Sequence, residues 1–269
     1  MPYHSLLLHL SLLLLLLLPP STASISSSSG CGLPDDEAPL KTVRRFAYFP
    51  GQPRWSRPSP LHLTYSLSPT NTIDYVNRPA IEAAMRRSFA RWAKVIPMTF
   101  SHSKDYQTAD VKVAFYAGDH GDGQPFDGVL GVLAHAFSPE NGRLHLDAAE
   151  RWAVDFSKED SKVAVDLESV LTHEIGHVLG LAHSTVQEAV MYPSLSPRTK
   201  KVNLRVDDIE GVQALYGSNP NFTLSSLLEA ETSDALRRGG RADGGGLGEL
   251  IRRVIIGFFF LFFFYFLVS

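Results

Sequence analysis

The chain has 269 residues, a formal net charge of −3 and a hydrophobic content of 44 %. So small a net charge gives no support for nucleic-acid binding, which uses basic surfaces to neutralise phosphates. The single cysteine, Cys31, excludes an internal disulfide, so its thiol is incidental, intermolecular or a metal ligand.

Residues 1–23 form a leucine-rich run that ends in PPSTA. We predict a secretory signal peptide here, because small residues precede a plausible cut, although the usual Lys or Arg is missing from its start. A membrane anchor is the alternative, but the apolar run is too short to span a bilayer. Residues 24–45, which include the stretch CGLPD from Cys31, are predicted as a short segment ahead of the folded domain.

The next elements are read from periodicity and are predicted to be scaffold. Residues 61–67 alternate well enough for a strand, and residues 98–103 and 110–116 read as two more. Residues 78–96 predict a helix with Pro79 in its first turn. Its packing face recurs at helical spacing and consists of Ile81, Met85, Phe89 and Trp92.

Two groups of metal-type ligands lie between residues 120 and 150. The first is a three-histidine, one-aspartate set, which makes a complete tetrahedral shell and predicts a structural zinc: His120, Asp122, His135 and His145. The second predicts a calcium site from carboxylates and the carbonyls of the 128–132 loop: Asp127, Gly128, Leu130, Val132, Asp147 and Glu150. The alternative for both groups is loop histidines and solvated acids.

The most informative stretch is residues 172–183, which read THEIGHVLGLAH. Residues 166–171 predict the start of a helix on which His173 and His177 share one face. Apolar residues form its packing face: Leu167, Val170, Leu171, Val178 and Leu179. Two helical histidines are by themselves often ordinary surface or core groups. Here a third histidine, a glutamate and a glycine stand in fixed register with them.

His183 follows His177 by six residues and would face away from it on a continuing helix. The chain must therefore break, and Gly180 stands where a left-handed residue would end the helix. Three imidazoles then make a catalytic zinc site that leaves one position for water. Glu174 is predicted to act beside that water as the general base and to pass the proton to the leaving amine.

Residues 206–217 predict a last helix, with Asp207 as its cap and Gly217 as its stop. Residues 219–253 read as a linker with one glycosylation acceptor at Asn221. The hydrophobic residues 254–269 are predicted as a GPI-anchor signal. A spanning helix is the alternative, but about fifteen apolar residues are short of the roughly twenty that a bilayer needs.

The order of these motifs resembles the matrixin domain of the metzincin zinc endopeptidases. The matching stretches are HGDxxPFDG, LAHAF, HxDxxExW, HExxHxxGxxH and MYP, and the compact loop at 137–144 is similar to the plant branch. The resemblance covers Cys31 and about 46–221. It implies an α+β catalytic domain at 46–218, with a twisted, mostly parallel five-stranded sheet, an antiparallel edge strand and three helices.

The resemblance also implies roles for individual residues. The CGxPD stretch is similar to a cysteine switch, in which Cys31 would fill the open zinc position, although Gly30 stands where the family has arginine and the pro-segment is short. Met191 would be the Met-turn that packs under the metal. Asp110 matches a second calcium position, but the loop that completes that site is cut short here. One aspartate of the pair Asp207 and Asp208 would receive the amino terminus freed by cleavage at about 41–48.

The expected activity is therefore that of a secreted or cell-surface zinc endopeptidase acting on extended peptides. Residues 131–136 match an edge strand, with the Ala134 carbonyl holding the substrate. Pro193 and Leu195 would line the pocket for a large apolar residue after the cut. The expected state is a monomer tethered to the membrane by its C-terminal anchor. A catalytically silent surface binding protein and an astacin-like metzincin are the alternatives, and Cys31 with the His₃Asp set argues against the astacin.

Overall fold

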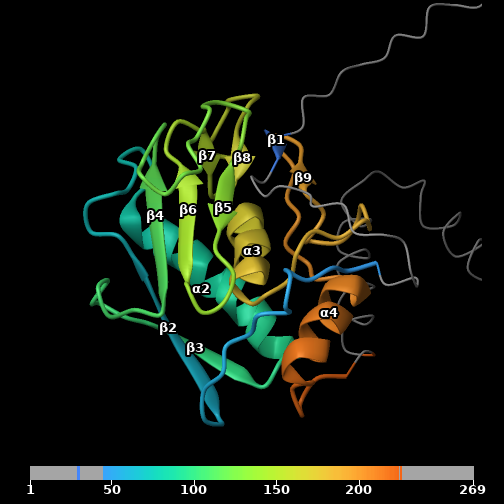
Figure 1. Cartoon of the computed structure of the whole chain (residues 1–269). Coiled ribbons are helices and arrows are strands. Elements are labelled where there is room, and N and C mark those ends of the chain that lie inside the picture. The colour runs from blue at the N-terminus through green and yellow to red at the C-terminus, as the bar shows by residue number, and fades with distance from the viewer. Residues whose placement is uncertain (1–28, 31–44, 224, 226–269) are drawn as a thin grey trace, which may run out of the picture.

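The computed structural model describes residues 29–30, 45–223 and 225 (Figure 1). The predicted signal peptide, Cys31 and the hydrophobic segment 254–269 lie outside the described residues. Within the part that is described, no helix is both long enough and apolar enough to cross a membrane.

A five-stranded sheet forms the centre of the fold, in the order β3-β2-β4-β6-β5. The strands are β2 (Leu61–Leu67), β3 (Met98–His102), β4 (Val111–Tyr116), β5 (Ala134–Ala136) and β6 (Arg143–Asp147). The first four strands in the sheet order pair in parallel, whereas β5 runs antiparallel to β6 at one edge. This confirms the predicted sheet, although β5 spans only three residues of the expected edge strand.

The described helices α2 (Arg78–Val95), α3 (Leu167–Val178) and α4 (Val206–Tyr216) confirm the predicted three. The Asn77 side chain caps α2 by accepting from the Ala80 N–H at 2.9 Å, and Pro79 lies in the first turn. All four residues of the predicted packing face of α2 are buried. Helix α3 contacts α2 on one side and β5 and β6 on another (Figure 1).

Helix α3 is more deeply enclosed than its sequence pattern indicates. The pattern predicts one apolar packing face, but all twelve residues of the helix are buried. Its polar side chains therefore lie in the interior, where each one needs a partner or a ligand. The indole N–H of Trp92 on α2 donates to the Thr172 carbonyl at 2.9 Å, and the Asp166 side chain caps the first turn.

The break after α3 occurs at the predicted glycine. Gly180 has a φ of +102°, and a Cβ added there would lie 2.3 Å from the Pro53 carbonyl oxygen. The Leu181 N–H turns back to the Gly176 carbonyl at 3.0 Å, and the indole N–H of Trp55 donates to the Val178 carbonyl at 2.9 Å. Only glycine fits this turn, because both its φ and its close approach to the backbone exclude a side chain.

The start of α4 corrects one prediction, since Arg205 and not Asp207 occupies the capping position. The Asp208 carboxylate accepts from the Arg205 N–H at 2.8 Å and from the Val190 and Met191 N–H groups at 2.9 and 3.0 Å. The Asp207 carboxylate accepts from the Ser184 hydroxyl at 2.6 Å. The tertiary contact of Asp208 with the 190–191 turn thus decides where the helix begins.

Two small sheets complete the described fold. Strand β7 (Trp152–Ala153) pairs in parallel with β8 (Val165–Asp166), just before α3. Strand β1 (Ser29–Gly30) pairs antiparallel with β9 (Ser194–Leu195). The described residues directly before Cys31 therefore lie against the segment that follows the predicted Met-turn.

Candidate functional site

The break at Gly180 brings the third histidine back to the first two. One ring nitrogen each from His173, His177 and His183 lies within 4.8 Å of the others. The ring centroids are 4.7 Å apart for the helical pair, and His183 lies 5.4 and 4.9 Å from His173 and His177. These are the separations that a single ion between three imidazoles requires.

The backbone sets the tautomers of the two helical histidines. The Nδ1–H of His173 donates to the Val190 carbonyl and that of His177 to the Leu181 carbonyl, both at 2.7 Å. Their Nε2 atoms are buried without a hydrogen-bond partner. Burial lowers the pKa of His173 to about 3 and that of His177 well below its ordinary value. Neutral imidazoles with an unused Nε2 lone pair fit a zinc ion.

Glu174 is fully buried and lines the same cavity as His173. Its place on α3, directly after the first histidine, puts a carboxylate beside the histidine cluster. Met191 lies under this turn of the helix, where a Cβ added at Gly176 would meet its Sδ at 2.2 Å. The buried Met191 therefore packs against the helix that carries His173 and His177.

A cavity lies beside His173 and Glu174. Its lining residues are Leu133, Ser169, Val170, His173, Glu174, Val190, Tyr192, Pro193, Ser194, Leu195 and Lys201. Pro193 and Leu195 are among these residues, whereas Ala134 lies on the edge strand β5 and is not among them. Two lining residues were not predicted from the sequence, Ser169 and Lys201. Ser169 could have been predicted, because it lies one helical turn before His173, whereas no local pattern indicates Lys201.

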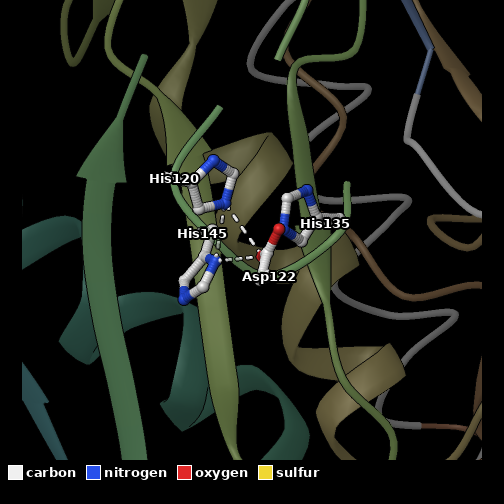
Figure 2. A group of neighbouring side chains, drawn as sticks. All are labelled: His120, Asp122, His135 and His145. Atoms are coloured by element: carbon white, nitrogen blue, oxygen red, sulfur yellow. Dashed lines mark hydrogen bonds and ion pairs between the residues drawn. The ribbon is translucent and has the colours of Figure 1, made fainter. Parts of the chain in front are cut away.

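A second cluster joins β5 and β6 to the loop after β4 (Figure 2). The Asp122 Oδ2 lies 2.8 Å from His120 Nε2, 2.8 Å from His135 Nε2 and 2.9 Å from His145 Nδ1. His120 Nε2 and His145 Nδ1 are 3.1 Å apart. A tetrahedral zinc with bonds near 2.05 Å separates its ligands by about 3.3 Å, so this set fits a closed zinc site.

The protonation states of this second cluster also suit a metal. Burial lowers the pKa of His145 to about 4 and that of His135 below its ordinary value. Burial alone would raise the pKa of Asp122, but the Gln124 N–H and the imidazoles outweigh it and hold that pKa low. His135 and His145 in their neutral form beside an ionised Asp122 suit a metal ion.

The predicted calcium ligands gather around the 128–132 loop. Asp147 accepts from the Gly128 N–H at 3.2 Å, Glu150 from the Leu130 N–H at 2.6 Å, and Asp127 from the Val132 N–H at 2.7 Å. Burial raises the pKa of Asp147, and it raises that of Glu150 to about 7. The Glu150 Oε2 is buried without a hydrogen-bond partner. A cation is the natural partner for three acids in this setting.

Asp110, the expected ligand of a second calcium, already has protein partners. Arg57 donates to its Oδ1 at 2.6 Å, and the Thr64 N–H and hydroxyl donate to its Oδ2 at 2.7 and 2.8 Å. Burial raises the pKa of Asp110, but the bonds from Thr64 and Arg57 outweigh burial and lower it. The arginine thus supplies the charge that a calcium ion would bring. Asn221, the expected glycosylation acceptor, is exposed after α4.

Comparison with known proteins agrees with this geometry. The family model described as matrixin matches residues 54–217. Metalloendoproteinase 4-MMP of Arabidopsis thaliana is 61 % identical over 215 residues, which cover 78 % of this chain and 63 % of the relative. Metalloendoproteinase 1-MMP of the same plant is 55 % identical over 216 residues, which cover 78 % of this chain and 58 % of the relative. Interstitial collagenase of Oryctolagus cuniculus is 40 % identical over 194 residues, 71 % of this chain and 37 % of the relative.

The chain thus spans less than two thirds of the length of these relatives. The matched region contains both histidine clusters, the 128–132 loop and the cavity. On the family match and the identity to plant metalloendoproteinases, the chain belongs to the matrixin family of metalloendopeptidases.

Proposed function

We propose that this chain is a zinc-dependent endopeptidase that cleaves extended peptides before a large apolar residue. The observation that carries the proposal is the buried histidine triad, whose helical members keep an unused Nε2, next to Glu174 in one cavity. Zinc, when bound, supplies a Lewis acid that polarises the scissile carbonyl and acidifies water. His173, His177 and His183 would hold it.

Glu174 performs the proton transfers in this proposal. Its carboxylate takes a proton from the attacking water and later delivers it to the nitrogen of the leaving amine. Its buried position, in a cavity that it shares with His173, favours this role. The complete triad and the presence of Glu174 disfavour the alternative of a silent binding protein on the same fold.

The edge strand and the cavity position the substrate. Among the described strands, β5 lies at the edge of the five-stranded sheet, next to β6. An extended peptide adds there as an antiparallel strand through main-chain hydrogen bonds, with the Ala134 carbonyl as one acceptor. The side chain after the cut then enters the cavity walled by Pro193 and Leu195, and the apolar lining favours leucine and similar residues.

The proposed endopeptidase also includes a structural zinc, a calcium ion and an inhibitory cysteine. His120, Asp122, His135 and His145 hold a structural zinc, and the carboxylates around the 128–132 loop hold calcium. Cys31 acts as an inhibitory thiolate at the catalytic zinc. The pairing of Ser29 and Gly30 with β9 supports this role, because it brings the residues before Cys31 to the cavity wall.

The proposed setting is the outside of the cell. Secretion, a GPI anchor at the C-terminal end, glycosylation at Asn221 and a monomeric state are parts of this proposal. Two of its supports are the leucine-rich start of the chain and the exposed sequon.

The test is the substitution Glu174→Ala in the full chain. We expect cleavage of an unstructured peptide before leucine by the parent chain, and loss of activity on chelation. Glu174→Ala should lower kcat/KM by about 10³-fold or more while the zinc content stays unchanged, because the base is lost and the ligands remain. Activity that survives in a zinc-loaded Glu174→Ala protein would remove Glu174 from the mechanism.

A further inference from the structure

The cavity runs along α3, away from the histidine triad. Ser169 and His173 are one helical turn apart, and both line the cavity together with Glu174. The end near His173 and Glu174 is where the peptide bond is cut. We call the Ser169 end, which lies one helical turn farther from that bond, the deep end, and the tip of the substrate side chain would reach it.

Hydrogen bonds hold both the backbone and the side chain of Lys201 at this deep end. Its backbone N–H donates to the Ser169 hydroxyl oxygen at 2.7 Å, and its Nζ donates to the Gln187 carbonyl at 2.7 Å. The Nζ also lies 5.1 Å from the ring centroid of Tyr192, another lining residue. The aliphatic stem of Lys201 thus runs from α3 to the 184–191 turn. Burial lowers the pKa of Lys201, which agrees with a partly enclosed amine.

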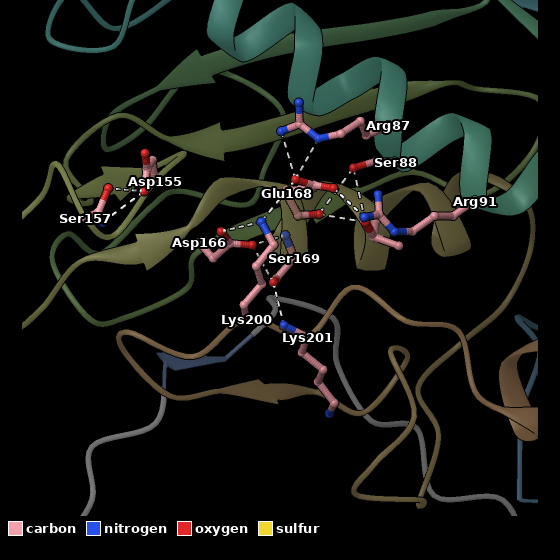
Figure 3. Close-up of polar contacts among 11 residues, drawn as sticks. Arg87, Ser88, Arg91, Asp155, Ser157, Asp166, Glu168, Ser169, Lys200 and Lys201 are labelled. Atoms are coloured by element: carbon pink, nitrogen blue, oxygen red, sulfur yellow. Dashed lines mark hydrogen bonds and ion pairs between the residues drawn. The ribbon is translucent and has the colours of Figure 1, made fainter. Parts of the chain in front are cut away.

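The preceding lysine makes contacts of a different kind (Figure 3). Lys200 Nζ lies 3.4 Å from Asp166 Oδ2 and 3.1 Å from Glu168 Oε2, and Lys200 is not among the lining residues. In Figure 3 the Lys201 side chain points away from this acidic group. The two adjacent lysines thus contact different groups: Lys200 contacts Asp166 and Glu168, and Lys201 lines the cavity. Lys200 is therefore a matched control for Lys201.

We propose that Lys201 is a specificity-determining residue, whose stem closes the deep end of the cavity and limits the length of the side chain accepted after the cut. The inference rests on the proposed endopeptidase function and adds to it. The rest of the lining includes apolar side chains, among them Val170, Val190 and Leu195. A leucine side chain contacts these side chains only, whereas a tryptophan side chain reaches the lysine stem.

The experiment compares two peptides that differ only in leucine or tryptophan after the cut. All proteins are the full, zinc-loaded chain with Cys31→Ser, so that the thiol does not compete for the metal. We expect Lys201→Ala to raise the tryptophan-to-leucine ratio of kcat/KM about tenfold, the size of effect that pocket volume has on selectivity. Lys201→Met keeps a stem of similar length and should keep the parent ratio, and so should Lys200→Ala.

A binding measurement keeps the test independent of turnover. Two peptide hydroxamates that carry a leucine or a tryptophan side chain should show the same change in the ratio of Kd for Lys201→Ala. An unchanged ratio in Lys201→Ala overturns the proposal, and so does an equal change in Lys200→Ala. A parent chain that binds the hydroxamates but cleaves neither peptide would contradict the proposed function, while the ratios of Kd still decide the role of Lys201.

Discussion

At the scale of single residues, Glu168 shows how α3 is held in place. Its side chain is 2 % exposed and contacts Arg87 at 2.8 Å, Arg91 at 2.5 Å and Lys200 at 3.1 Å (Figure 3). Burial would raise the pKa of Glu168, but these cations outweigh burial and lower it to about 2. A buried carboxylate with several cationic partners stabilises the fold only while it is ionised.

The sign of the pH dependence follows from that lowered pKa. The stabilisation is complete above the ordinary value of 4.5 and is lost as the pH falls from there towards about 2. We expect Glu168→Gln to lower the free energy of unfolding by roughly 2–4 kcal/mol at pH 7. The difference from the parent chain should shrink at pH 3, measured by denaturant unfolding of both metal-free proteins. A difference that is equal at both pH values would contradict the ionised role of Glu168.

At the scale of elements, the fit between α3 and the 184–191 turn depends on Gly176. A Cβ there would lie 2.2 Å from the Met191 Sδ and 3.1 Å from Cζ2 of Trp92. Two effects oppose each other at this position. Alanine gains about 1 kcal/mol over glycine in a helix interior, whereas overpacking a filled core costs roughly 1–3 kcal/mol.

We expect the overpacking to dominate, because the methionine is buried and the backbone N–H of Met191 is fixed by Asp208. Gly176→Ala should therefore lower the free energy of unfolding by roughly 1–2 kcal/mol. In a double-mutant cycle with Met191→Ala, the two losses should not add, since the smaller side chain removes the clash. Strictly additive losses would show that Gly176 and Met191 do not conflict as the distances indicate.

At the scale of the whole molecule, the second histidine cluster connects the loop after β4 to strands β5 and β6. His135 on β5 stands directly opposite His145 on β6, and His120 and Asp122 reach them from the loop. A zinc ion there would join the loop after β4 to both β5 and β6. Its binding energy would contribute directly to folding.

The substitution His145→Ala tests this role. We expect the zinc content to fall from about two equivalents to about one and Tm to drop by several degrees, because the closed site loses a ligand and the triad does not. The exposed His102 on β3 provides the control, and His102→Ala should change neither quantity. Full zinc content in His145→Ala would contradict the role of His145 as a zinc ligand, and a parent chain with only about one equivalent would show that the cluster is held by hydrogen bonds alone.

Much of the fold and of the candidate site was predictable from local spacing. The positions of His173, His177 and Glu174 on one helix follow from its period, and the break at Gly180 follows from where His183 must return. The alternation in residues 61–67 and the periodicity in 78–96 likewise match β2 and α2. Each of these features depends on residues within one or two turns of each other, where geometry is set by the chain itself.

The sequence by itself thus determined the spacing of the three histidines, the turn at Gly180 that brings His183 back to the other two, and the order of the helices and strands. Only the tertiary structure decided that Asp208 rather than Asp207 holds the start of α4, that Arg57 satisfies Asp110, and that Lys201 lines the cavity. The physical reason is that these contacts join segments distant in the chain. No local period encodes which charged side chain meets which buried partner, so packing alone makes that choice.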